Sequence, residues 1–151
     1  MLLSARQQER LNLKFWRLDF NMNSIFSKII RREIPGHIIL EDDHFIAFLD
    51  VMPLVPGHVL AVPKREVDYI FELEEDELAG LMTFSRKVAR ALKQAIKCRR
   101  IGISVIGLEV PHAHVHLVPI NSADDLNFTR PKLNPTPEEL KEIADRIRTF
   151  L

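Results

Sequence analysis

The stretch "PHAHVHLVPI" at residues 111–120 places His112, His114 and His116 at every second position, in a chain that contains only six histidines. In a β-strand, alternate side chains point to the same face of the sheet, about 6.5–7 Å apart. The intervening residues are Ala, Val and Leu, which suit a buried face. The pattern therefore predicts a strand with one packed face and one face that carries three imidazoles.

The composition is typical of a single globular domain. The chain has 151 residues, of which 46% are hydrophobic, enough for one domain with a substantial core and too few for two. Its 21 basic residues balance 21 acidic ones, so no overall field attracts nucleic acid or an anionic membrane. The single cysteine, Cys98, excludes an internal disulfide and agrees with a reducing compartment.

The first 21 residues lack the continuous apolar run of a signal peptide or a membrane span. We therefore expect a cytoplasmic protein without a membrane segment. Leu11, Phe15 and Leu18 have helical spacing and could form an amphipathic helix for a partner or a membrane surface, whereas a start at Met22 would make the segment dispensable. The predicted organisation is an N-terminal extension over 1–21 and a single domain over 22–151.

The remaining sequence mixes helical and strand-like patterns without the regular alternation of a parallel sheet. Ser24 is a candidate N-cap for a short helix that ends at Pro35-Gly36, and a capping box at Thr136 begins a C-terminal helix over 137–151. Apolar residues repeat at helical spacing from about Glu74 to Lys97. The strand-like segments are 37–41, 44–49, 58–62, 101–106 and 112–120. Hairpin-length links between several of them predict an α+β class with a mainly antiparallel sheet of about five strands.

Three interpretations of the histidine row remain open on the residues alone. The rings could be hydrogen-bonded structural groups, or they could be ligands of a metal-dependent hydrolase that His58 or Glu109 completes. In the third interpretation, a neutral imidazole attacks phosphorus while its second ring nitrogen is fixed by a hydrogen bond. The central His114 is then the nucleophile, because it has a neighbouring imidazole on each side.

The motif "HAHVHLVP" resembles the pattern His-φ-His-φ-His-φ-φ, with φ apolar, of the histidine triad (HIT) family of nucleotide hydrolases and transferases. Earlier segments resemble blocks of that family in the same order: "SIFSKIIRREIPG", "EDDHFIAFLD" and "PGHVLAVPK". The resemblance covers roughly residues 24–120. It implies a HIT-like fold, a homodimer and two successive displacements at the α-phosphate of a nucleotide, with no metal or other cofactor.

The resemblance also implies roles for individual residues. His114 attacks and becomes nucleotidyl-histidine, His116 contacts the phosphate or the leaving group, and His112 positions the nucleophile. His58 supports the row from the neighbouring strand. Asp50 binds the ribose, because a carboxylate can accept hydrogen bonds from two hydroxyls at once. The residues that match the nucleoside slot are Ile25, Phe26, Ile29 and Phe48, with Val51 beside the ribose ligand.

The chain departs from the family pattern at a position that often binds structural zinc. Ser24 and Ser27 stand where many members have Cys-x-x-Cys, and Glu66 stands after "PK" where they have a histidine. We therefore expect this chain to lack the structural zinc.

The approach to the histidine row also differs. Glu109 lies where the family often has a polar residue of a Gly-rich phosphate loop, and a carboxylate repels phosphate unless it points away, takes a proton or binds another group. Ile120 replaces a frequent arginine. Ser104 could supply a polar contact from the preceding strand. Arg130 or Lys132 could reach a phosphate, or could lie in a solvated loop.

The leading hypothesis is a nucleotide phosphoramidase, a dinucleotide hydrolase or a nucleotidyl transferase that acts on a purine nucleotide. Two alternatives stay open. The first is a metal-dependent hydrolase that uses the histidine cluster as ligands. The second is a non-catalytic nucleotide-binding sensor in which Glu109 prevents turnover.

Overall fold

The computed structural model describes residues 23–151, so the predicted extension over 1–21, with its helical spacing, lies outside the described residues. The helices are α2 (Ile25–Ile30), α3 (Glu75–Ala95) and α4 (Pro137–Arg148), with single 3-10 turns η1 (Ile70–Glu72) and η2 (Ala123–Leu126). The strands are β1 (Ile38–Glu41), β2 (Phe45–Leu49), β3 (Val59–Pro63), β4 (Arg100–Ser104) and β5 (Val115–Ile120).

The five strands form one sheet in the order β1-β2-β3-β5-β4, and every neighbouring pair is antiparallel. The predicted α+β class with a five-stranded antiparallel sheet is thus confirmed. β5 lies between β3 and β4, so the segment that carries the histidine row is an inner strand with neighbours on both sides.

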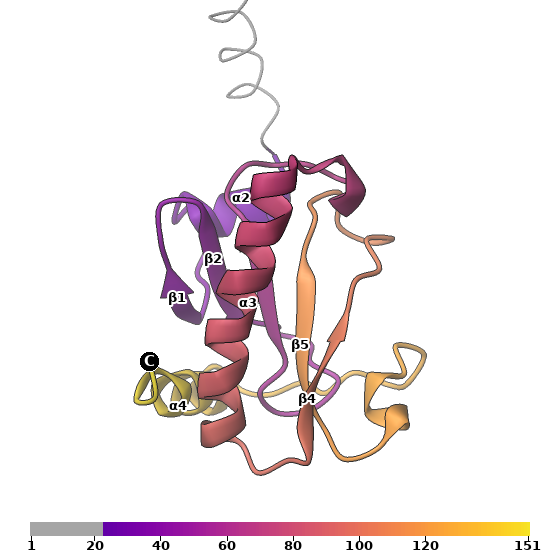
Figure 1. Cartoon of the computed structure of the whole chain (residues 1–151). Coiled ribbons are helices and arrows are strands. Elements are labelled where there is room, and N and C mark those ends of the chain that lie inside the picture. Colours follow the sequence, from indigo (N-terminus) through magenta and orange to yellow (C-terminus); the bar gives the residue numbers. More distant parts are fainter. Residues whose placement is uncertain (1–22) are drawn as a thin grey trace, which may run out of the picture.

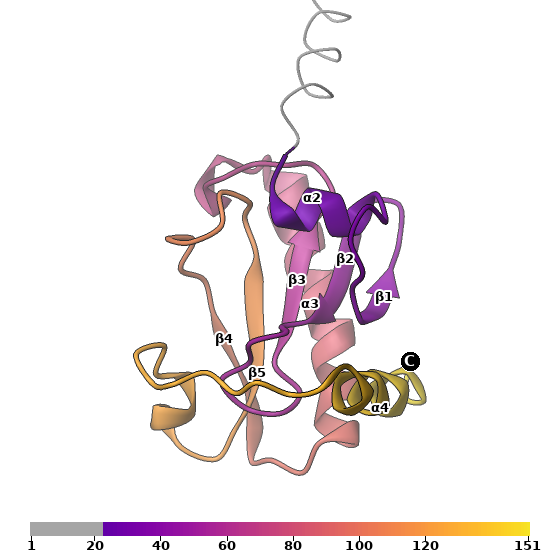
Figure 2. The same cartoon turned by 180° about the vertical axis from the view of Figure 1, so that it is seen from behind.

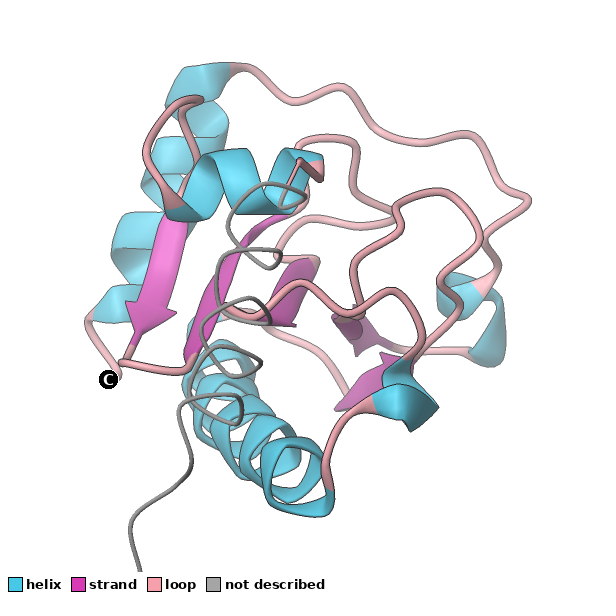
Figure 3. Cartoon of the chain, turned by 90° about the horizontal axis from the view of Figure 1, so that it is seen from above, coloured by secondary structure: helices cyan, strands magenta, loops and turns pink. Residues whose placement is uncertain are grey.

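Helices cover the two faces of the sheet unequally. The long helix α3 crosses one face, and α2 lies on the opposite face (Figures 1 and 2). In the view from above, the strands lie between these two helices (Figure 3). The face that carries α2 is also crossed by the segment from η2 to α4 (Figure 2). This second face holds the histidine row.

Two apolar clusters follow from this arrangement. The larger one fills the space between the sheet and α3 and includes Leu81, Val88 and Leu92 of the helix and Leu140 and Ile147 of α4. Burying one such aliphatic side chain contributes about 1.5–3 kcal/mol. The smaller cluster lies under α2 and consists of Phe26, Ile29, Ile46, Phe48, Leu60 and Val62.

Most predicted boundaries differ from the observed ones by one or two residues, and three differ by more. The short helix is capped by Ser24 as expected but ends at Ile30, because Arg32 has a φ of 62°, which a right-handed helix excludes. The C-terminal helix has the predicted capping box and ends at Arg148. β5 begins only at Val115, because the amide of Ala113 donates to the carbonyl of Val67 (2.7 Å), outside the ladder. Two of the three histidines therefore precede the strand.

None of the helices within residues 23–151 is both long and apolar enough to cross a membrane.

Candidate active site

Four histidines gather on the α2 face of the sheet. His116 lies within β5 opposite Leu60 of β3, while His112 and His114 precede that strand. His58 directly precedes β3, after a turn in which Gly57 has a φ of 86° that suits glycine. All four rings are at least 93% buried, with exposures between 0% and 7%. The alternating pattern of the sequence thus does bring the row together with His58, as predicted.

The tautomer of His114 follows from its one hydrogen bond. Its Nδ1 lies 2.7 Å from the carbonyl oxygen of His112, and a carbonyl can only accept, so Nδ1 carries the proton. The lone pair of His114 is therefore on Nε2. Within residues 23–151, Ser85 Oγ is the one side-chain polar atom that is both fully buried and without a hydrogen-bond partner. Nε2 of His114 has no partner in this range either, so it is not fully buried and is accessible from the site. This is the state that a nucleophile requires.

The backbone carbonyl of His112, and not its ring, orients His114. The sequence predicted a positioning role for His112 but gave no sign that the main chain would carry it out.

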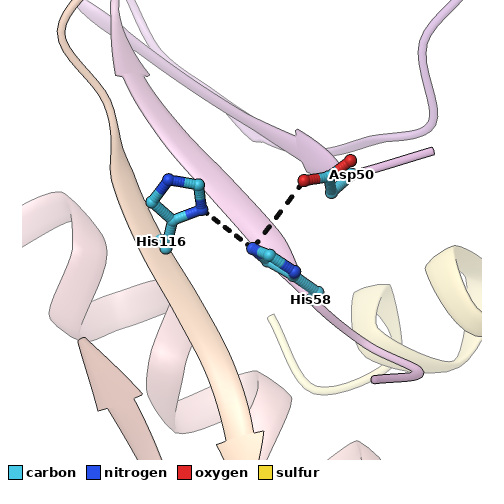
Figure 4. A group of neighbouring side chains, drawn as sticks. All are labelled: Asp50, His58 and His116. Carbon is cyan, nitrogen blue, oxygen red and sulfur yellow. Dashed lines mark hydrogen bonds and ion pairs between the residues drawn. The ribbon is translucent and has the colours of Figure 1, made fainter. Parts of the chain in front are cut away.

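A second chain of hydrogen bonds fixes His116. The amide of Leu54 donates to Nδ1 of His58 (3.0 Å), so the proton of His58 is on Nε2. This Nε2 donates to Nδ1 of His116 (2.9 Å), as Figure 4 shows for the two rings. The proton of His116 is consequently on its own Nε2. His114 thus offers a lone pair, and the neighbouring ring, with its centroid 4.8 Å away, offers a hydrogen-bond donor.

His112 is held by a separate cluster of hydrogen bonds. Its Nε2 donates to the carbonyl of Pro63 (2.7 Å), so its Nδ1 accepts from the hydroxyl of Ser24 (2.7 Å). Glu66 Oε1 in turn accepts from the amide of Ser24 (2.6 Å) and from the hydroxyl of Ser27 (2.9 Å). We call Ser24, Ser27, Glu66 and His112 the serine–glutamate cluster. Both polar atoms of the His112 ring are satisfied.

These residues do not fit the structural zinc that the resemblance associates with this position. Structural zinc is held by thiolates and imidazoles, whereas two of the four groups here are hydroxyls. The His112 Nδ1 that a metal would need already accepts a hydrogen bond from Ser24. The cluster links α2 to the segment that carries the histidine row through hydrogen bonds.

Burial keeps the histidines neutral. Loss of solvation, followed by the charges of nearby groups, lowers the pKa of His58 to about 4 and that of His116 to about 3. Burial also lowers the pKa of His112 and of His114, although the carbonyl of His112 and the carboxylates of Asp50 and Glu109 oppose the shift at His114. All four rings are therefore uncharged near pH 7.

The predicted ribose ligand, Asp50, lies beside this row. Its Oδ2 is 3.8 Å from Nε2 of His58, and its Oδ1 accepts from the amide of Met52 (2.9 Å) (Figure 4). Burial raises the pKa of this carboxyl, while the bond to Met52 and the charge of Lys132 lower it. The side chain is 23% exposed and, with His58, lines a cavity beside the row.

Asp50, His58 and His116 also lie close enough together to be tested as a metal site. A histidine that binds a metal usually donates its other ring N–H to an acceptor. His58 does the opposite, because its Nδ1 accepts from the amide of Leu54 and its Nε2 carries the proton that points at His116. These hydrogen bonds oppose a metal at this group. The set also differs from the ligands that the metal-dependent alternative assumed.

The residues of the predicted nucleoside slot separate into two groups. Phe26, Ile29 and Phe48 are buried in the cluster under α2, where the Phe26 ring lies 5.0 Å from that of His114. Ile25 and Val51 are exposed by 52% and 55%. The buried residues form the support of an apolar wall, and the two exposed residues offer surface to a ligand.

Ser104 and Glu109 lie on the β4 side of the row. Ser104 pairs with His116 across the ladder, so their side chains share a face. Glu109 is exposed and borders, with Ser24 and Ile25, a hollow of about 400 Å³ beside α2. Its negative charge partly opposes the lowering of the His114 pKa by burial.

Sequence reasoning missed Phe128. Its ring contacts that of His116 at 4.8 Å and lies 6.2 Å from that of His58. It also missed Leu54 and Pro63, whose backbone groups fix the rings of His58 and His112. No periodic pattern marks a loop residue that packs on a distant strand, so the sequence held no signal for these contacts.

A cavity of about 390 Å³ borders the site on the side of α4, with Asp50 and His58 in its wall. Its other walls come from the loop before β3, from the segment that leads to α4 and from that helix.

Comparison with known proteins identifies this arrangement. A curated relative, an uncharacterised HIT-like protein of Borreliella burgdorferi, is 34% identical over 131 residues, which are 82% of this chain and 94% of the relative. The structure of a HIT-like protein of Bartonella henselae has a TM-score of 0.75 at 32% identity, covering 87% of this chain and 98% of that one. The structure of a hypothetical histidine triad nucleotide-binding protein of Sulfolobus tokodaii has a TM-score of 0.71 at 30% identity, covering 83% of this chain and 89% of that one. A sequence model of the HIT domain matches residues 31–123, and on this match and the shared fold the chain belongs to the HIT domain family.

Proposed function

We propose that the chain is a nucleotide hydrolase or nucleotidyl transferase that forms a covalent intermediate on His114. The observation that carries this proposal is the hydrogen bond from His114 Nδ1 to the carbonyl of His112, which leaves a lone pair on Nε2 of an uncharged ring. The Sulfolobus tokodaii protein, described as nucleotide-binding, supports a nucleotide as the ligand. The proposed substrates are purine nucleoside phosphoramidates or dinucleotides.

In the first step, Nε2 of His114 forms a bond to the α-phosphorus while the bond from phosphorus to the leaving group breaks. The electron pair of that bond departs with the leaving group, and an amine leaving group also takes up a proton from solvent. Nε2–H of His116 donates a hydrogen bond to the leaving group or to a phosphate oxygen, where negative charge accumulates. The proton of His114 stays on Nδ1, and its hydrogen bond to the carbonyl of His112 stabilises the positive charge that develops on the ring.

In the second step, water or another acceptor attacks phosphorus and the bond to His114 breaks. The electron pair returns to Nε2, the proton of the acceptor passes to solvent, and the nucleoside monophosphate or its ester is released. Asp50 holds the ribose hydroxyls throughout, and the exposed side chains of Ile25 and Val51 contact the base.

The test is to incubate the protein with adenosine 5′-phosphoramidate and with diadenosine triphosphate, beside His114→Ala. We expect turnover by the wild type, an acid-labile adenylyl adduct on a peptide that contains His114, and a loss of at least about 10³-fold in kcat for the variant. Equal turnover by the two proteins would exclude His114 as the nucleophile. Binding of AMP by calorimetry without turnover of either compound would favour the sensor.

We also propose a homodimer in the cytoplasm, where a protein with a single cysteine, Cys98, is stable without disulfides. β4 is an edge strand, and four apolar side chains near its C-terminal end, one within the strand and three after it, are exposed by 41–88%. These residues are Ile103, Val105, Ile106 and Leu108. Light scattering of the purified protein measures whether its mass is that of two chains, and cell fractionation tests the location.

A further inference from the structure

The segment between η2 and α4, residues 127–135, crosses the same face of the sheet as the histidine row (Figure 2). We call it the strap. It lies beyond the residues that match the HIT domain, which end at 123. The amide of Leu133 donates to the carbonyl of Pro53 (2.9 Å), which ties the strap to the loop that leads to His58. The strap is therefore a fixed part of the site.

Phe128 of the strap places this segment on the His116 side of the row. Its ring stacks edge-on against that of His116 at 4.8 Å and against that of His58 at 6.2 Å. Any group that accepts a hydrogen bond from His116 therefore binds next to the strap.

Lys132 supplies a positive charge at this position. Its Nζ lies 4.9 Å from the centre of the Phe128 ring and donates to the carbonyl of Phe128 (3.2 Å). An ammonium has three N–H donors, so two remain for a ligand. Within residues 23–151, Lys132 forms no ion pair with a carboxylate, whereas Arg130 of the same strap pairs with Asp124 and Asp125 (3.4 and 3.5 Å).

The effect of this cation on its neighbours agrees with the geometry. The charge of Lys132 contributes to the lowered pKa of both His58 and His116 and lowers that of Asp50. The carboxylates of Asp50 and Glu109 act in the opposite sense at His114. A polyphosphate would meet repulsion on the Glu109 side of the row and attraction on the strap side.

We propose that Lys132, held against Phe128, binds the phosphate chain of the leaving group and makes the site select dinucleoside polyphosphates over nucleoside phosphoramidates. This inference rests on the proposed function, since it assumes that a leaving group departs from the phosphorus beside His116. Phe128 holds the ammonium in place, and the ammonium neutralises the negative charge that the leaving group gains. A phosphoramidate releases an amine without such a charge and does not need the cation.

The experiment compares diadenosine triphosphate with adenosine 5′-phosphoramidate, which share the same AMP half. Lys132→Gln removes the charge and keeps a donor for the Phe128 carbonyl, so it separates charge from the integrity of the strap. Lys132→Arg restores the charge. Arg130→Gln is the matched control, because it removes a cation of the same strap that is already paired with aspartates.

For Lys132→Gln we expect kcat/KM to fall about 10- to 100-fold with the triphosphate, as for loss of a charge-assisted hydrogen bond, and to stay within about 3-fold with the phosphoramidate. Lys132→Arg should recover most of the loss, and Arg130→Gln should change neither value. Equal losses on both substrates, no loss on the triphosphate, or wild-type preference for the phosphoramidate would each overturn this inference alone. Wild-type failure on both substrates would overturn the proposed function with it.

Discussion

The two ends of the histidine row have opposite characters. At the first end, both ring nitrogens of His112 are bonded inside the protein, to Pro63 and Ser24, and the serine–glutamate cluster closes the space around them. At the other end, His116 receives one bond, from His58, and keeps Nε2–H for a ligand. His112 is 0% exposed and His116 is 7% exposed. The first end therefore stabilises the fold around His114, and in the proposed reaction the second end acts on the substrate.

The largest expected effect is a loss of activity from a substitution at the His116 end of the row. His58→Phe keeps an aromatic ring but removes the donor to His116 Nδ1, so His116 can adopt the tautomer that has no proton on the substrate side. We expect kcat to fall about 100-fold, in the range for loss of a general acid, with KM changed less than about 3-fold. Steady-state kinetics measures both. His58→Asn, which retains an N–H donor, should recover part of the loss, and an unchanged kcat in His58→Phe would contradict the assigned tautomers.

Substitutions at the His112 end of the row should mainly change the stability of the fold. Ser24→Ala removes the cap of α2 and leaves His112 Nδ1 without its donor in a fully buried position. We expect the free energy of unfolding to fall by about 1–3 kcal/mol, measured by urea denaturation, with kcat reduced less than about 10-fold.

Glu66→Gln is the matched variant at the same end, because its amide oxygen can still accept from Ser24 and Ser27. It should cost less than about 1 kcal/mol. If Ser24→Ala instead left stability unchanged and reduced kcat about 100-fold, the distinction between the two ends would fail.

The last expected change is not visible at constant pH near 7, but is seen in the pH dependence of stability. In the folded chain His58 has a pKa of about 4 and His116 a pKa of about 3, because burial lowers both from the ordinary histidine value of 6.5. Between pH 6.5 and about 4 the unfolded chain therefore binds more protons than the folded one, and stability falls as the pH falls. Each such histidine contributes a slope of about 1.4 kcal/mol per pH unit. Urea denaturation at several pH values should show a shallower slope in His58→Phe, whereas equal slopes would indicate that His58 titrates normally in the fold.

Much of the fold was predictable because the chain carries strong local signals. The apolar repeat of α3, the Ser24 cap and the Thr136 capping box each determine a helix from nearby residues. The hairpin of β1 and β2 follows from two apolar runs with an Asp-Asp link. The start of β5 was not predictable in the same way, since it depends on a bond from Ala113 to Val67, far away in the sequence.

The candidate site was predictable in its residues and less so in its connections. The row pattern and the resemblance named His58, His112, His114 and His116, which the structure brings together. The acceptor for His114, the donor for His58 and the stacking of Phe128 all depend on loop geometry. Glu66 was noticed as a departure, but its bonds to both serines were not foreseen, because they join residues about 40 positions apart.

Three of the groups that orient the rings belong to the main chain: the amide of Leu54 and the carbonyls of Pro63 and His112. A peptide group neither titrates in the physiological range nor disappears when a side chain is exchanged. Which nitrogen of each of these rings carries the proton is thus determined by the path of the backbone. Sequence drift at these three positions leaves it intact, with proline at 54 as the one natural replacement that would delete the first donor.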